Sequence, residues 1–254
     1  MPQESLLTIN DVQKAYDGVE ALRNVNLAVT PGEVVVVLGP SGCGKSTLLR
    51  CINGLEGIQA GSIWLGGQEI TGPGTKWTEV RQRVGMVFQN YELFAHMTVM
   101  GNILLGPLKV QKRTKQEATQ MAEELLRRVG LYEKKDAYPR QLSGGQKQRV
   151  AIVRALMMQP QLMLFDEVTA ALDPEMVREV LDVMLGLAKE GMTMLIVTHE
   201  MQFARSIADR VVFMDAGEIV EVAKPDGFFT SPKTRRAQEF LNIFEFEPAR
   251  HAAH

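Results

Sequence analysis

One short segment, Gly39–Ser46 (GPSGCGKS), constrains this chain more than any other part of it. It fits the pattern G-x-x-x-x-G-K-[ST], with the apolar run Val34–Leu38 before it and a helix-like stretch, Thr47–Ile52, after it. Glycines let the backbone curl so that several N–H groups face one point, and the following helix adds the positive end of its dipole. The segment therefore predicts a phosphate-binding loop (P-loop). An ordinary glycine-rich turn would not require lysine and serine directly after the last glycine.

The side chains of this loop have expected roles. Lys45 supplies a mobile cation for the β- and γ-phosphates of ATP, and Ser46 offers an oxygen to Mg²⁺. Cys43 precedes a helix N-terminus, which can lower a thiol pKa and so allows a redox switch. We expect instead an inert bystander at a small-residue position. ATP and Mg²⁺ are the expected cofactors. The remaining expected ATP contacts from this loop are Gly39, Pro40, Ser41, Gly42, Cys43, Gly44 and Thr47.

Two carboxylates, Asp166 and Glu167, end the apolar run Leu162–Phe165. The carboxyl end of a buried parallel strand is where α/β sheets bind ligands. In a chain with a P-loop, Asp166 is expected to hold Mg²⁺, directly or through water. Glu167 is expected to be the general base, or to orient the attacking water. The alternative is a pair of surface acids at a strand end.

A second glycine motif, Leu142–Gln146 (LSGGQ), follows much later. Ser143-x-x-Gln146 is a capping box, which by itself predicts only a helix start. Gly144 and Gly145 add bare backbone at a positive helix end, open to an anion. Because the chain already has a P-loop for its own nucleotide, this second anion site suggests binding across an interface.

Strand-like and helix-like segments alternate, which predicts an α/β fold. The apolar runs of Val34–Leu38, Leu162–Phe165 and Met194–Val197 suit parallel strands buried on both faces. Leu6–Asp11 and Ala21–Val29 instead resemble an antiparallel edge with turns beside them.

The middle of the chain reads as helical, with a capping box at Thr114 and a later helix starting at Asp173-Pro174. We therefore expect one domain over residues 1–254. Its α/β core takes residues 1–89 and 159–244, a helical subdomain takes residues 90–158, and residues 245–254 form a disordered tail.

The bulk composition excludes some classes of protein. Lys and Arg number 28 against 30 Asp and Glu, a net charge of -2, so nucleic acid is not an expected partner. The 2 cysteines are too few for a disulfide framework. No apolar run approaches the ~20 residues of a membrane-spanning helix. The first ten residues lack the pattern of a signal peptide, so none is expected.

Taken together, these motifs resemble those of ATP-binding cassette (ABC) proteins over essentially the whole chain. The resemblance implies a P-loop NTPase (RecA-like) core with an antiparallel β edge and an inserted α-helical subdomain. The matching segments, in order, are Gly39–Thr47, Gln89, Leu142–Gln146, Leu162–Glu167, Ala171–Asp173 and His199.

The resemblance also implies a head-to-tail dimer with a second copy of the chain. Tyr16 would stack on adenine, although a tyrosine simply packed at a strand edge is the alternative. Gln89 would sense Mg²⁺ and the attacking water, and His199 would touch the γ-phosphate. Asp173 would both cap a helix and serve at the dimer interface. Each ATP would lie between one P-loop and the opposite chain's Ser143, Gly144, Gly145 and Gln146.

Three classes of P-loop protein compete for the function. A small-molecule kinase has no use for LSGGQ. A soluble ABC ATPase acting on nucleic acid or ribosomes normally has long heptads or a second cassette, and neither is present. A transporter motor remains. Five segments resemble those of bacterial importers of polar amino acids, with a leaning towards glutamate and aspartate importers. They are Val84–Gln89, Leu93–Val99, Met192–Met201, Phe213–Glu221 and Phe228–Leu241.

This resemblance implies partners and a location. The partners are transmembrane permease subunits and, indirectly, an extracytoplasmic amino-acid-binding protein; the location is peripheral, on the cytoplasmic face of the inner membrane. Tyr91–Thr98 is rich in apolar side chains directly after Gln89. It forms either core packing or an exposed groove for a permease helix, and we expect the groove, with Phe94 as an anchor.

Overall fold

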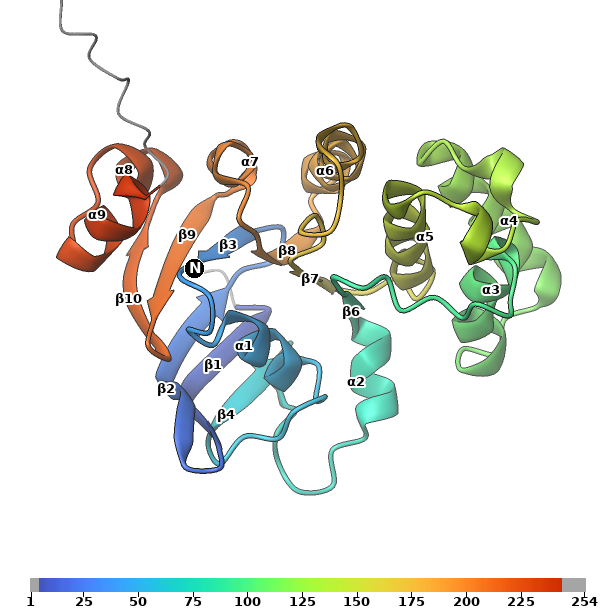
Figure 1. Cartoon of the computed structure of the whole chain (residues 1–254). Coiled ribbons are helices and arrows are strands. Elements are labelled where there is room, and N and C mark those ends of the chain that lie inside the picture. The colour runs from blue at the N-terminus through green and yellow to red at the C-terminus, as the bar shows by residue number, and fades with distance from the viewer. Residues whose placement is uncertain (1–4, 244–254) are drawn as a thin grey trace, which may run out of the picture.

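A computed structural model describes residues 5–243 and contains two sheets (Figure 1). The larger sheet has the strand order β10-β9-β3-β8-β7-β6, in which only β10 runs antiparallel to its neighbour. The predicted parallel strands are confirmed, since every residue of β3, β7 and β8 is buried. The strands are β3 (Val34–Leu38), β6 (Val84–Val87), β7 (Leu162–Asp166), β8 (Thr193–Val197), β9 (Arg210–Asp215) and β10 (Glu218–Ala223).

The early antiparallel strands form a sheet of their own, in the order β2-β1-β4-β5. Its strands are β1 (Leu7–Tyr16), β2 (Val19–Val29), β4 (Ala60–Leu65) and β5 (Gln68–Glu69). Alternate residues of β1 and β2, such as Leu7 and Val25, share one buried core with Val35 of β3 and Leu195 of β8. The antiparallel edge expected from the sequence is thus a second layer that packs on the parallel sheet, with α1 (Lys45–Ile52) in the same core.

Three of the remaining helices, α4, α5 and α6, begin where the sequence predicts. Thr114 forms a capping box with Glu117, and Ser143 forms one with Gln146. Asp173 is the N-cap residue of α6, but its side chain makes no cap hydrogen bond. The helices are α2 (Trp77–Arg83), α3 (Val99–Lys109), α4 (Lys115–Arg128), α5 (Gly144–Leu156), α6 (Pro174–Lys189), α7 (Met201–Ile207), α8 (Pro225–Thr230) and α9 (Arg235–Asn242).

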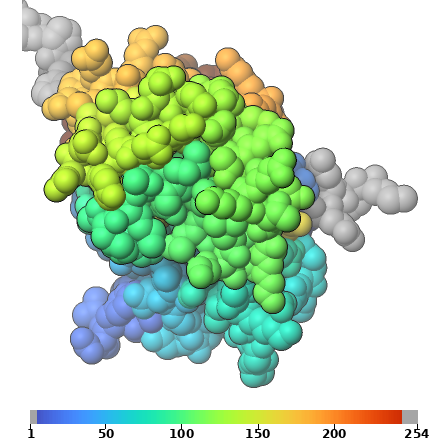
Figure 2. Space-filling view, turned by 90° about the vertical axis from the view of Figure 1, so that its right-hand side faces the viewer, coloured from blue at the N-terminus to red at the C-terminus, as the bar shows by residue number. Residues whose placement is uncertain are grey.

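Helices α3, α4 and α5 gather at one side of the molecule, beyond β6 (Figure 1). They enclose a separate core that includes Ile103, Leu126 and Val150. Figure 2 faces this side, and α3 and α4, in green, cover most of it. The inserted helical subdomain is therefore present. The predicted tail, residues 245–254, lies outside the described residues. Within residues 5–243, no helix is both long and apolar enough to span a bilayer.

Candidate active site

The P-loop runs from the end of β3 to the start of α1 and is pressed against neighbouring backbone. A Cβ atom on Gly39, whose φ is 150°, would lie 2.1 Å from the carbonyl oxygen of Met214. Only glycine fits there. Lys45 is 4% exposed, and its Nζ donates hydrogen bonds of 2.8 Å to the carbonyl oxygens of Gly39 and Pro40. The cation therefore lies inside the curl of the loop, as a phosphate site requires.

Ser46 and Asp166 meet although they are far apart in the sequence. The Ser46 hydroxyl donates a 2.6 Å hydrogen bond to Asp166 Oδ1. Asp166 is nearly buried, and this burial raises the pKa of its carboxyl, against the lowering effect of the Ser46 hydrogen bond. A hydroxyl and a carboxylate are hard oxygen ligands of the kind that Mg²⁺ prefers, so this pair fits the expected ion. Bound there, Mg²⁺ would neutralise charge on the phosphates.

Glu167 follows β7 in a left-handed conformation, with φ 48°. Its amide donates to the Val197 carbonyl at the end of β8 (3.0 Å), which holds this unfavourable backbone in place. His199 Nε2 lies 3.0 Å from Glu167 Oε1. The imidazole can donate its N–H to the carboxylate and so orient it, which is the arrangement that a base acting on water requires.

The sheet register brings Gln89 to the same edge. Val87 of β6 pairs with Phe165 of β7, so Gln89 and Glu167 each lie two residues beyond a paired position. Parallel strands end at one edge of their sheet, and the P-loop, Asp166, Glu167, His199 and Gln89 all lie at or just after the ends of strands at this edge. The carboxylates are therefore not unrelated surface acids.

Tyr16, at the end of β1, lies near Thr47 at the end of the P-loop. Burial raises the pKa of Tyr16, against the lowering effect of Thr47, yet the ring is 40% exposed. Lys14 Nζ lies 4.6 Å from the ring centroid and 3.3 Å from Glu56. No sequence motif pointed to this contact between Lys14 and the ring. A half-exposed aromatic ring next to the phosphate loop is available for stacking on a base.

The LSGGQ segment begins α5, and Figure 1 shows this helix well apart from α1. The Ser143 hydroxyl accepts from Gln146 N (3.2 Å), and Gln146 Oε1 accepts from Ser143 N (3.1 Å). A Cβ on Gly145 would lie 2.9 Å from Met176 Cβ, so this glycine is also required for packing on α6. Sequence reasoning missed that second role. Within one chain, LSGGQ does not join the P-loop cluster.

Burial outweighs the nearby helix end at Cys43. The side chain is 4% exposed, and burial raises the pKa of the thiol despite Lys45 nearby. Burial also raises the pKa of Cys51, to about 12. Both cysteines are free. A buried, protonated thiol reacts slowly, so Cys43 is a small packing residue of the loop rather than a redox switch.

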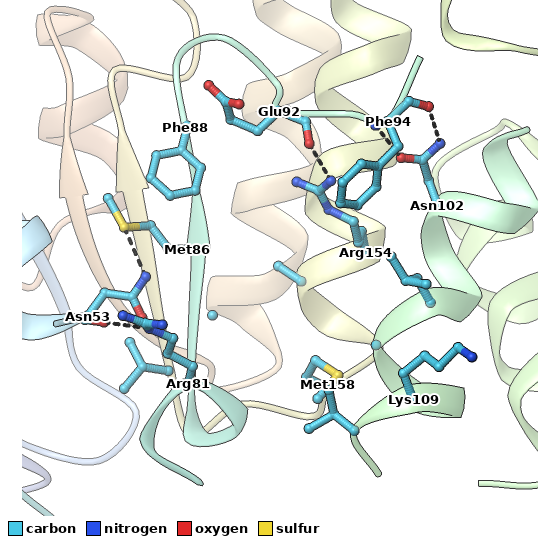
Figure 3. Close-up of a pocket in the computed structure, with 16 residues that line it drawn as sticks. Asn53, Arg81, Met86, Phe88, Glu92, Phe94, Asn102, Lys109, Arg154 and Met158 are labelled. Carbon is cyan, nitrogen blue, oxygen red and sulfur yellow. Dashed lines mark hydrogen bonds between the residues drawn. The ribbon is translucent and has the colours of Figure 1, made fainter. Parts of the chain in front are cut away.

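A groove of about 750 Å³ lies between β6 and the helical subdomain (Figure 3). Its apolar lining includes Met86, Phe88, Phe94 and Met158. Phe94 is 43% exposed, which contradicts core packing for this side chain, whereas neighbouring Leu93 does pack against the core. The buried Asn102 side chain accepts from the Phe94 amide and donates to the Phe94 carbonyl, and so holds the main chain of Phe94 in place.

Comparison with known proteins is consistent with this geometry. The profile of the ABC transporter family matches residues 22–170. The chain belongs to this family. The cassette is 56% identical to the arginine transport ATP-binding protein ArtM of Bacillus subtilis and 57% identical to the glutamate transport ATP-binding protein GluA of Corynebacterium efficiens. Each alignment covers 93% of the cassette and 98% of the relative.

The fold comparison agrees. The cassette superposes on a dimeric ATP-binding cassette, MJ0796, in a post-hydrolysis state with ADP and phosphate, with a TM-score of 0.78 and 31% identity. That alignment covers 86% of this chain and 98% of the other. The cassette is therefore an ATPase with the fold expected from its motifs.

Proposed function

We propose that this cassette is the ATP-hydrolysing subunit of an importer for polar amino acids. The near full-length similarity to two amino-acid transport ATP-binding proteins carries this proposal. Arginine and glutamate have opposite side-chain charges, yet the two relatives named for them are equally similar to this cassette. The cargo is therefore selected by other subunits, and polar amino acids are proposed only as a class, with glutamate and aspartate still a prediction.

In the proposed chemistry, Lys45 and the P-loop amides hold the phosphates of ATP, with Tyr16 against the adenine. Ser46 and Asp166 are the ion ligands, with Gln89 completing that set. Glu167 takes a proton from the attacking water. His199 keeps the Glu167 carboxylate aligned beside the γ-phosphate. The 3.0 Å contact between these last two side chains supports their shared role.

We further propose that the cassette works as a head-to-tail dimer. The separation of α5 from the P-loop supports this, because the bare backbone at Gly144 then has no nucleotide of its own to meet. In a dimer, Ser143, Gly144, Gly145 and Gln146 would reach the ATP held by the other chain, with Asp173 nearby at the start of α6.

The groove supports a membrane partner. A short permease helix would place an apolar side chain against Phe94, next to the turn that follows Gln89. This would hold the cassette at the cytoplasmic face of the inner membrane, where a permease in turn meets an extracytoplasmic amino-acid-binding protein. An apolar groove does not suit nucleic acid, which phosphate-binding basic surfaces recognise, so we favour the permease over a soluble role on DNA or ribosomes.

The test is reconstitution of the cassette in vesicles with the permease and binding protein encoded beside it. ATPase activity and uptake are measured with arginine, lysine, glutamate, aspartate and glutamine, with maltose as the control cargo. We expect at least one amino acid to stimulate ATPase and to accumulate, and a Glu167→Gln cassette to support neither. Uptake of no amino acid, or stimulation by DNA or ribosomes instead, would contradict the proposal.

A further inference from the structure

The turn directly after Gln89 has an unfavourable backbone. Tyr91 and Glu92 are consecutive non-glycine residues in the left-handed region, with φ 62° and 50°. Residues with a Cβ atom avoid this region, and neither tyrosine nor glutamate has the short polar side chain that eases it. Such a turn persists only where surrounding contacts hold it.

Those contacts come from α5. The Arg154 guanidinium donates to the carbonyl oxygens of both Glu92 and Tyr91, the second at 3.2 Å (Figure 3 shows the first). Burial lowers the pKa of Arg154, and its hydrogen bonds here go to main-chain carbonyls rather than to a carboxylate. The carbonyls of two strained residues are thus gathered by a single side chain.

A second residue of α5 holds the other side of Gln89. Gln148 is fully buried, and its Nε2 donates a 3.2 Å hydrogen bond to the Phe88 carbonyl. The start of the helix is also in contact with the turn, because the Tyr91 hydroxyl lies 3.0 Å from where a Cβ on Gly144 would be. Helix α5 therefore contacts the chain both before and after Gln89.

We propose that Gln148 and Arg154 are positioning residues, which tie Gln89 to α5 and thereby set where Gln89 lies relative to Glu167. This inference rests on the role proposed above for Gln89. A helix is stiff, and about ten residues at ~1.5 Å per residue separate the start of α5 from Arg154. If the Ser143–Gly145 end of α5 is displaced, Arg154 therefore moves with it and displaces the Tyr91–Glu92 turn. The start of α5 would contact the ATP held by the partner chain, and residues further along α5 would position the chain's own Gln89.

The first test uses the full-length chain and steady-state ATPase kinetics. We expect Arg154→Met to lower kcat about tenfold or more, with KM and the Kd for ATP changed less than about threefold, because the loss falls on the reaction and not on binding. Arg149→Met is the matched control. It removes an arginine of the same helix that bonds the Val129 carbonyl and Glu179, away from the turn, and should leave kcat near wild type.

A double-mutant cycle separates positioning from a general structural role. If Arg154 acts through Gln89, the chain with both Arg154→Met and Gln89→Ala should have a kcat within about twofold of Gln89→Ala alone. If the two losses multiply, the inference is wrong. A wild-type kcat in Arg154→Met would also overturn it while leaving the role of Gln89 intact. A wild-type kcat in Gln89→Ala would overturn that role, and this inference with it.

Glycine rescue tests the backbone argument. Glu92 is exposed, and glycine adopts its left-handed conformation without a steric cost, so Glu92→Gly reduces the need for a clamp. We expect Glu92→Gly to restore kcat about threefold or more in the Arg154→Met chain and to change little in the wild-type chain. A helix that had merely lost packing would not recover in this way, so absence of rescue counts against the inference.

Discussion

His199 Nε2 and Glu167 Oε1 lie 3.0 Å apart, at the ends of two neighbouring strands. The paired strands fix both main chains, so the carboxylate is aimed by its partner rather than left to rotate in solvent. A residue aimed in this way is a candidate base whose removal should affect the reaction far more than the binding of ATP.

Changing Glu167 to glutamine tests that distinction. The amide keeps the size of the side chain and can still accept from His199, but it cannot take a proton. We expect turnover to fall about 10²-fold or more, while the Kd for ATP stays close to wild type and a Mg-ATP dimer persists on size-exclusion chromatography. Glu190→Gln, at the far end of α6, should hydrolyse ATP normally. A Glu167→Gln chain that stays monomeric and turns over ATP would contradict the assignment.

Mixing two damaged chains tests the shared site. Lys45→Ala should weaken ATP binding, because it removes the cation inside the P-loop, and Ser143→Arg should block the opposite face of the nucleotide. Each variant alone should lose ATPase activity. A mixed dimer places both lesions in one site and leaves the other intact, so mixing should restore part of the wild-type rate. If Ser143→Arg alone hydrolyses ATP at the wild-type rate, the site is not shared.

The Asp166 carboxylate is expected to lower the stability of the folded chain, although hydrolysis requires it. Burial raises its carboxyl pKa, so its ionised form is disfavoured in the folded chain. Its favourable contribution is present while it is protonated and is lost as pH rises through the folded pKa. Without nucleotide or Mg²⁺, Asp166→Asn should therefore melt higher at neutral pH. A gain of about 1 kcal/mol corresponds to roughly 2–4 °C in a domain of this size.

The same substitution has a pH signature. The difference in melting temperature should shrink as pH falls towards about 4, where the ordinary carboxyl pKa lies, because the wild-type side chain then also becomes neutral. Hydrolysis should be lost throughout. A lower melting temperature for Asp166→Asn at neutral pH would contradict the argument.

Phe94→Ala distinguishes an interface anchor from a core residue. The ring is 43% exposed, so the isolated chain should lose well under the ~3–5 kcal/mol of a buried phenylalanine and should still bind ATP. Assembly with the permease should weaken, by ~2 kcal/mol or more. Phe165→Ala, in the fully buried strand β7, is the control that should melt much lower. Normal assembly with a large loss of melting temperature would place Phe94 in the core after all.

Features set by nearby residues could be predicted from the sequence. The capping boxes at Thr114 and Ser143 depend on side chains three positions apart, and the buried strands are visible as apolar runs. The P-loop could be recognised because its glycines, lysine and serine are contiguous. The expected place of Asp166 and Glu167 followed from where parallel strands end.

Features that depend on tertiary contact could not be predicted. Nothing near Glu92 shows that Arg154 bonds its carbonyl, and nothing near Gly145 points to Met176. The burial of Cys43 is another such feature. The sequence shows the adjacent helix end, which would lower the thiol pKa, but not the burial that outweighs it. The separate antiparallel layer likewise depends on how β2 and β1 pack, which no local pattern records.

Because β6 is an edge strand of its sheet, the residues of the site differ in how firmly the sheet holds them. The P-loop, Glu167 and His199 leave β3, β7 and β8, each with a strand on both sides, whereas among residues 5–243 β6 pairs only with β7. Shifting an inner strand would break two ladders of hydrogen bonds, and shifting the end of β6 would strain only one. The reacting groups are thus held by inner strands that resist displacement, whereas Gln89 follows an edge strand that is displaced more easily. ATP can therefore stay in one position in the P-loop while Gln89 moves relative to it.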